Sequence, residues 1–231
     1  MEKMKNDGLK EVANEVIGLE HNKIFATIKY LTINPSQVIF EYCKGEKNKY
    51  LSPVVYFLGV ESVKLYLMSI TGLFDRILKR QMENLSSWMN SPQDETDRIT
   101  NNLNSFYSFF NTEYGREIIS LPIILLLAWL FYKRYNNSFK ENSWFALYTW
   151  GHASLLTIPI ILFLYLGMDV ALFIPIAYAI IVLYWTWAST KFYNLKFGKA
   201  LTVRILMQVA YVLTIGITST LLPKAIRLFT D

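Results

Sequence analysis

Residues 34–66 read NPSQVIFEYCKGEKNKYLSPVVYFLGVESVKLY and join a polar, lysine-rich segment to a long apolar run. Proline fixes its own φ and keeps the residue before it out of the helical region, so Asn34-Pro35 predicts the start of a short helix. Gly45 is placed to end that helix, within a basic collar formed by Lys44, Lys47 and Lys49. Because such collars flank apolar spans at a membrane surface, this stretch predicts where the chain enters a membrane.

The composition is that of an integral membrane protein. The chain has 231 residues, of which 53% are hydrophobic and 16% aromatic. Its apolar residues gather in runs close to the roughly 20 residues that cross a bilayer. We therefore expect an all-α, polytopic membrane helix bundle of about five transmembrane helices, at about 51–74, 118–132, 144–167, 170–189 and 201–222.

The remaining segments are polar and contain amphipathic patterns. Residues 1–49 are predicted to form a cytoplasmic amphipathic arm, residues 50–222 the membrane domain, and residues 223–231 a C-terminal tail. Within the membrane domain, apolar residues recur at helical spacing over 75–116 around a central Asn-Ser-Pro turn, which predicts a helical hairpin on the outer face.

The distribution of basic residues predicts the orientation. Lysines and arginines lie in the loops near 133–140 and 191–199, whereas the turn at 167–169 has none. The positive-inside rule then predicts a multi-pass protein of a bacterial inner membrane, with its N-terminus cytoplasmic and its C-terminus extracytoplasmic. The net charge of +5 is explained by lysines beside anionic lipid head groups, so we expect the lipid bilayer and no nucleic acid as a partner.

Three segments carry a family resemblance. They are Asn34-Pro35 with Tyr42 and Tyr50-x-x-Pro53, then Tyr148 with His152, then Tyr178 to Tyr193 followed by Gly198. This order resembles a bacterial integral membrane family known as domain of unknown function 3667. The resemblance spans roughly residues 24–222 and implies a membrane fold, but no settled activity. Many members begin with a cysteine-based zinc ribbon, which this sequence lacks.

Polar side chains at membrane depth form the candidate site: Glu61, Lys64, Tyr148, His152, Arg204 and Gln208. Glu61 and Lys64 are three residues apart and share a helix face, which predicts an ion pair serving either proton coupling or local packing. His152 follows Tyr148 by one turn, so the tyrosine hydroxyl is expected to hold the imidazole. This histidine is either proton-linked or a buried hydrogen-bonding residue.

The last span has two further polar residues. Arg204 is expected to extend toward the inner surface or to bind a ligand, and Gln208 to hydrogen-bond another helix. Cys43 is the single cysteine and His21 the other histidine. An intramolecular disulfide, a cysteine zinc site and a histidine cluster are therefore excluded, and we expect no metal and no cofactor.

Three functions remain open. The sequence has no Gly-rich phosphate loop, paired-histidine metal motif or Gly-x-Ser-x-Gly turn. We expect a non-enzymatic scaffold or accessory subunit that binds a membrane protein partner, or a further copy of itself, through its arm and hairpin. The alternative is a small proton-linked transporter, monomeric or oligomeric, which requires the polar residues to share one cavity. An intramembrane enzyme would use Glu61 or His152 as general base.

Overall fold

The computed structural model describes residues 23–73, 76, 113–135 and 138–230. Side chains are described from Ser120 onward in the helix that begins at Glu113, and up to Thr214 in the last helix. Most of the predicted hairpin at 75–116 and the first part of the predicted arm lie outside these residues. The fold therefore concerns the segment from residue 23 to Ile70 and the four helices after residue 112.

Within the described residues the ordered segments are all helical, which confirms the predicted all-α class. A helical segment over 23–33 precedes the remaining elements along the chain, which are α2 (Pro35–Cys43), α3 (Pro53–Ile70), α6 (Glu113–Tyr132), the short 3₁₀ helix η1 (Lys133–Tyr135), α7 (Phe139–Tyr165), α8 (Val170–Phe192) and α9 (Phe197–Thr230).

The helix starts follow from local capping chemistry. Helix α2 begins at Pro35 as predicted, and Gly45 follows it with a φ of +101°, a conformation that suits glycine. At the start of α3 the Ser52 side chain accepts a hydrogen bond from the Val55 N–H at 3.2 Å. Asp169 caps α8 by accepting from the Ala171 N–H at 2.8 Å. Each cap satisfies a backbone donor that the first helical turn leaves without a partner.

Two helices extend beyond the predicted spans. Helix α7 begins at Phe139, before the predicted span start near 144, because Ser138 and Glu141 form a capping box in the polar segment that precedes the span. Helix α9 runs from Phe197 to Thr230 and passes the predicted end at Pro223. A proline removes one backbone donor and bends a helix, but in a membrane helix it need not end it.

Four described helices are long and apolar enough to cross a membrane: Pro53–Ile70, Phe139–Tyr165, Val170–Phe192 and Phe197–Thr214. They correspond to the first, third, fourth and fifth predicted spans. The second predicted span, 118–132, lies on α6, whose side chains are described only from Ser120. The structure thus supports a helical membrane bundle, and a fifth span stays a prediction.

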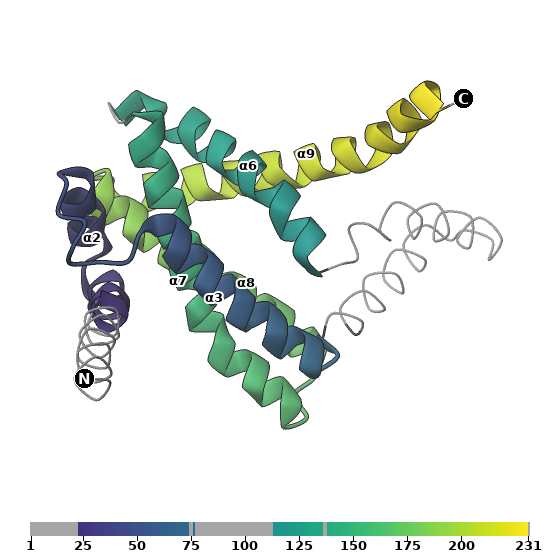
Figure 1. The fold of residues 1–231 in the computed structure, drawn as a ribbon, viewed down its shortest axis with the longest axis horizontal. Helices are drawn as coiled ribbons and strands as arrows, with labels where there is room; N and C mark the ends of the chain where they lie inside the picture. Colours follow the sequence, from purple (N-terminus) through teal and green to yellow (C-terminus); the bar gives the residue numbers. More distant parts are fainter. Residues whose placement is uncertain (1–22, 74–75, 77–112, 136–137, 231) are drawn as a thin grey trace, which may run out of the picture.

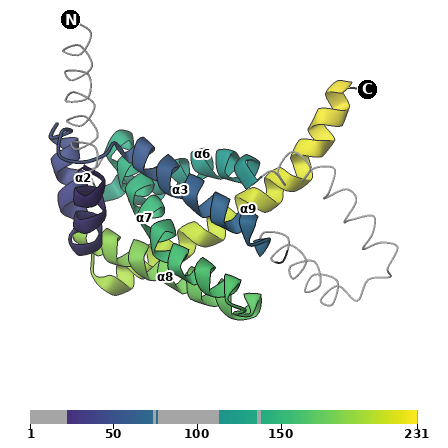
Figure 2. The same cartoon turned by 60° about the horizontal axis from the view of Figure 1, so that its bottom comes forward.

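Helix α7 lies at the centre of the bundle. It contacts α2, α3, α6 and α8, while α9 packs on α6 and α8 (Figures 1 and 2). Helices α3 and α7 run in the same direction. They pack closely at Gly151, where an added Cβ would lie 3.2 Å from the Phe57 Cα. The short turn after Tyr165 makes α7 and α8 antiparallel neighbours, as predicted.

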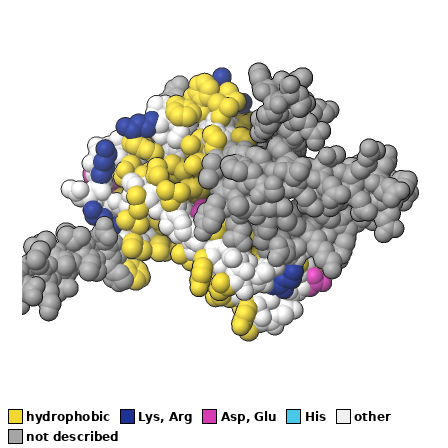
Figure 3. Space-filling model, turned by 45° about the vertical axis from the view of Figure 1, so that its right-hand side comes forward, with side chains coloured by type: hydrophobic (Ala, Val, Ile, Leu, Met, Phe, Trp, Pro, Cys, Tyr) yellow, Lys and Arg dark blue, Asp and Glu magenta, His cyan; other side chains and the backbone are white. Residues whose placement is uncertain are grey.

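The core contains part of the predicted arm. Leu31, Val38 and Ile39 are fully buried and belong to the same cluster as Tyr148 and Trp185. Apolar side chains gather on the described part of the face shown in Figure 3, and many large ones are exposed. Examples that are half-exposed or more lie on α3, α8 and α9: Val55, Val63, Leu172, Leu183, Val209 and Val212. This surface suits contact with lipid chains.

One end of the bundle is aromatic and basic. The rings of Tyr132 and Tyr193 stack with centroids 4.3 Å apart. The Lys199 Nζ lies 5.4 Å from the Tyr135 ring centroid, and the Lys140 Nζ lies 4.6 Å from the ring of Trp144 in α7. The two basic loops that the sequence placed on one side of the membrane are therefore adjacent in space.

Candidate functional site

The first polar group lies between α3 and α7 and consists of Glu61, Lys64 and Ser154. Glu61 and Lys64 form the predicted ion pair, with side chains that are 4% and 14% exposed. The Ser154 hydroxyl donates to Glu61 Oε1 at 2.5 Å and accepts from Lys64 Nζ at 3.4 Å. A buried charge needs a counter-charge and hydrogen bonds. Both are supplied here within two adjacent helices.

The second polar group centres on His152, which is fully buried. Its Nδ1 lies 2.7 Å from the Tyr56 hydroxyl and its Nε2 lies 3.0 Å from Thr32 Oγ1. The ring thus joins three segments of the chain: the helical segment over 23–33, α3 and α7. Its environment is completed by Tyr184 of α8, whose ring centroid lies 5.0 Å from the imidazole.

Either neutral tautomer of the imidazole satisfies both of these hydrogen bonds. When the Thr32 hydroxyl donates to the Ile28 carbonyl, 2.8 Å away, its oxygen accepts from the Nε2–H of His152, and Nδ1 accepts from Tyr56. When the Thr32 hydroxyl donates to Nε2 instead, the Nδ1–H donates to the Tyr56 oxygen. Both ring nitrogens are engaged in either case.

The predicted bond between Tyr148 and His152 is wrong. The Tyr148 hydroxyl donates instead to the Leu51 carbonyl at 2.5 Å. Side chains on a helix lean toward its N-terminus, so the Tyr148 hydroxyl extends away from a residue one turn later. A tyrosine of another helix, Tyr184, makes a matching contact by donating to the Leu31 carbonyl at 2.9 Å. Both bonds attach the N-terminal segment to the α7–α8 pair.

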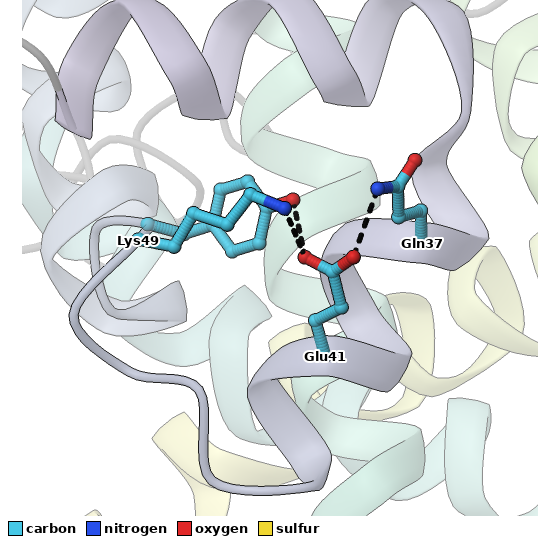
Figure 4. A network of polar contacts seen from close by, with 4 residues as sticks. Gln37, Glu41 and Lys49 are labelled. Atoms are coloured by element: carbon cyan, nitrogen blue, oxygen red, sulfur yellow. Dashed lines mark hydrogen bonds and ion pairs between the residues drawn. The ribbon is translucent and has the colours of Figure 1, made fainter.

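A third polar group, around Glu41, was not identified as a site from the sequence. Its carboxylate accepts hydrogen bonds from Gln37 Nε2 at 2.8 Å, Lys49 Nζ at 2.7 Å and the Tyr50 hydroxyl at 2.6 Å (Figure 4). Partial burial alone would raise the pKa of Glu41, but these hydrogen bonds outweigh it and lower the pKa to about 2. The signal available in the sequence was the four-residue spacing of Gln37 and Glu41.

The Glu41 group closes the loop between α2 and α3. Tyr50 is buried, and the Leu51 N–H donates to Thr27 Oγ1 at 3.0 Å, so hydrogen bonds from both residues hold the end of this loop.

Cys43 lies at the end of α2, and burial raises the pKa of its thiol to about 11. A thiol with this pKa is nearly all protonated at neutral pH and reacts slowly.

A cavity of about 150 Å³ lies between α6, α8 and α9 and contains the last two predicted residues. Arg204 is 6% exposed, and its guanidinium carbon lies 4.8 Å from the centroid of the Trp185 ring. The expected extension of Arg204 to the surface is therefore wrong, because the planar cation stacks on an aromatic face instead. Gln208 lines the same cavity and forms no hydrogen bond with another described residue.

The six predicted polar residues do not share one cavity. Glu61 and Lys64 pair beside Ser154, His152 lies between Tyr56 and Thr32, and Tyr148 bonds to the backbone before α3. Arg204 and Gln208 lie apart from them, against α6 and α8. Within the described part of the chain, no group of three or more His, Cys, Asp or Glu side chains is arranged to hold a metal ion.

These features define a helical membrane bundle whose N-terminal segment is tied to its central helices by buried hydrogen bonds. Residues 21–63 match the family described as "Protein of unknown function (DUF3667)", which confirms the predicted resemblance over that segment. Thr32, Tyr56 and Glu61, which bond to α7 side chains, all fall inside the matched segment. No curated protein and no solved structure matches the chain.

Proposed function

We propose that this protein is a non-enzymatic membrane scaffold or accessory subunit that binds a partner protein or a further copy of itself. The supporting observation is that the polar groups between α3 and α7 bond to each other. Glu61 is engaged by Lys64 and Ser154, and both ring nitrogens of His152 are occupied. These groups hold helices together.

Chemistry or transport would require a different arrangement. A general base needs a free lone pair within hydrogen-bond reach of a substrate, whereas both ring nitrogens of His152 are already in hydrogen bonds, to Tyr56 and to Thr32. A proton-linked transporter needs its ionisable groups around one pathway. The separation of the Glu61–Lys64 pair from Arg204 favours the scaffold over the transporter and over an intramembrane enzyme.

The partner-binding parts that we propose are the N-terminal arm and the hairpin. The experiment is purification of the full chain in a mild detergent, followed by mass determination of the intact complex. A stoichiometric second component or a defined homo-oligomer is expected. Deleting residues 1–22 should weaken that association without lowering the melting temperature, whereas deleting residues 224–231 is the matched control and should leave it unchanged. A chain that is recovered alone as a monomer contradicts the scaffold role.

The transport alternative is tested in vesicles. Purified protein is reconstituted into liposomes that contain a pH-sensitive dye, and proton entry is followed after an imposed pH gradient. Entry equal to that of protein-free vesicles is the expected result. A proton flux that the intact protein supports and that Glu61→Gln abolishes would favour the transporter. Folding of the variant is checked by its circular dichroism.

We also propose that the protein resides in a bacterial inner membrane with its basic end in the cytoplasm. The support is that the η1 segment and the α8–α9 connection lie together, while the turn from Leu166 to Asp169 has no lysine or arginine. In a Cys43→Ser background, Leu166→Cys should react with a membrane-impermeant maleimide in intact cells. Lys196→Cys should react only after permeabilisation. The opposite pattern would reverse the orientation.

A further inference from the structure

The cavity between α6, α8 and α9 contains the side chain of a cation, Arg204. Among the described residues that line this cavity, Arg204 is the only charged one. Among the residues that the structure describes, no carboxylate pairs with this guanidinium, and its Nε has no hydrogen-bond acceptor. The ring of Trp185 supplies a cation–π contact at 4.8 Å, which stabilises the charge but accepts none of its N–H hydrogen bonds.

A buried guanidinium nitrogen that has no acceptor is costly, because it has lost water without gaining a hydrogen bond. The guanidinium has five N–H donors in a planar fork that matches the oxygens of a phosphate. Gln208 lies one turn further along α9 and lines the same cavity, so its side-chain amide adds donors beside the guanidinium. The polar part of the cavity is therefore suited to one acidic group with several oxygens.

The remaining walls are apolar and aromatic, with Leu127, Trp150, Ile181 and Met207 among them. Tyr178 also lines the cavity and is 45% exposed, so the cavity reaches the surface that the bundle presents to lipid. Arg204 lies seven residues after Phe197, the first residue of α9, which places it about 10 Å along the helix from the basic end. This depth is within reach of a lipid head group, and the basic end attracts anionic lipids.

We propose that this cavity binds the phosphate group of an anionic phospholipid, with Arg204 as the main contact and the apolar walls against the acyl chain. A cavity of about 150 Å³ holds only part of such a molecule, so the rest of the lipid would lie along the outer surface of α8 and α9. This site does not depend on the scaffold role, and either could hold without the other.

The experiment uses the full chain, purified in a neutral detergent and stripped of bound lipid. Binding of phosphatidylglycerol and of phosphatidylcholine is measured by native mass spectrometry and by the shift in melting temperature. We expect phosphatidylglycerol to bind with one molecule per chain. Arg204→Met should weaken this binding about tenfold or more, since it removes charge-assisted hydrogen bonds. Lys196→Met, which removes one exposed charge at the same end, should change it by less than about threefold.

A second measurement separates binding from folding. Without anionic lipid, Arg204→Met should melt at the same temperature as the wild type or higher, because the variant removes an unpaired buried charge. Arg204→Lys keeps the charge but not the planar fork, so it should bind phosphatidylglycerol with intermediate strength. If Arg204→Met does not fold, the comparison of Arg204→Lys with the wild type takes its place.

Three results would overturn the proposal. The first is equal binding of phosphatidylcholine and phosphatidylglycerol to the wild type. The second is a loss of phosphatidylglycerol in Lys196→Met as large as in the Arg204 variants. The third is an Arg204-dependent rise in melting temperature with inorganic phosphate at millimolar concentration but none with phosphatidylglycerol, which would assign the site to a free oxyanion.

Discussion

The bond between Tyr56 and His152 can be tested by a double-mutant cycle. In Tyr56→Phe the Nδ1 of a fully buried ring loses its hydrogen-bond partner at 2.7 Å, and in His152→Leu the Tyr56 hydroxyl loses the same hydrogen bond. Leaving one buried polar group without a partner costs about 1–3 kcal/mol. The double variant removes both groups, so its loss should be smaller than the sum. We expect a coupling free energy of about 1–1.7 kcal/mol, toward the upper end of values measured within membrane proteins.

The assay is reversible unfolding of the purified variants in mixed micelles with increasing dodecyl sulfate, followed by circular dichroism and tryptophan fluorescence. The matched control is the cycle of Tyr148→Phe with His152→Leu. The Tyr148 hydroxyl bonds to the Leu51 carbonyl, so this second coupling should stay below about 0.5 kcal/mol. The hydrogen-bond assignment fails if the Tyr56 cycle shows no more coupling than the Tyr148 cycle.

Three further perturbations test other parts of the fold. Gly151→Leu should destabilise the bundle by about 1–3 kcal/mol or more in the same assay, because the α3 backbone lies 3.2 Å from the added Cβ. The control is Gly59→Leu, which has open space at its Cβ and should leave the free energy of unfolding nearly unchanged. The pKa of Glu41 is about 2 in the folded protein and about 4.3 in an unfolded chain. Its carboxylate therefore stabilises the fold above about pH 4.5, and that contribution is lost as the pH falls toward 2. Between pH 6 and pH 3 the melting temperature should fall less steeply for Glu41→Gln than for the wild type, and equal slopes would contradict the network. Ser154→Ala removes a hydroxyl from Glu61 and should cost about 1–3 kcal/mol, whereas an unchanged unfolding midpoint would mean that the ion pair needs no third group.

Much of the helical framework was predictable because its signals are local. Pro35 and Gly45 delimit α2, Pro53 follows the cap of α3, and a short turn from Leu166 to Asp169 separates α7 from α8. The Glu61–Lys64 pair was equally predictable, since residues three apart on a helix are neighbours. The start of α7 was not predicted, because its capping box lies in a polar segment that hydropathy alone assigns to a loop.

The contacts of the polar site were not predictable from spacing. The two partners of His152 lie 120 and 96 residues away along the chain, and only the parallel packing of α3 on α7 brings Tyr56 to the ring. Tyr148 was the nearest candidate along the chain, but the lean of helical side chains directs its hydroxyl elsewhere. Arg204 was expected at the surface because it lies close to the start of α9. It packs on the ring of Trp185 in α8 instead, and the sequence around Arg204 does not indicate that contact.

The fastening of the N-terminal segment has a consequence for biogenesis. Tyr184 bonds to the Leu31 carbonyl across 153 residues of chain, so the segment around Leu31 can complete its contacts only after α8 has been synthesised. Until then Leu31, Val38 and Ile39 lack the surface that buries them. We expect a nascent chain stalled before Tyr184 to expose this segment to protease, and one released after Phe192 to protect it.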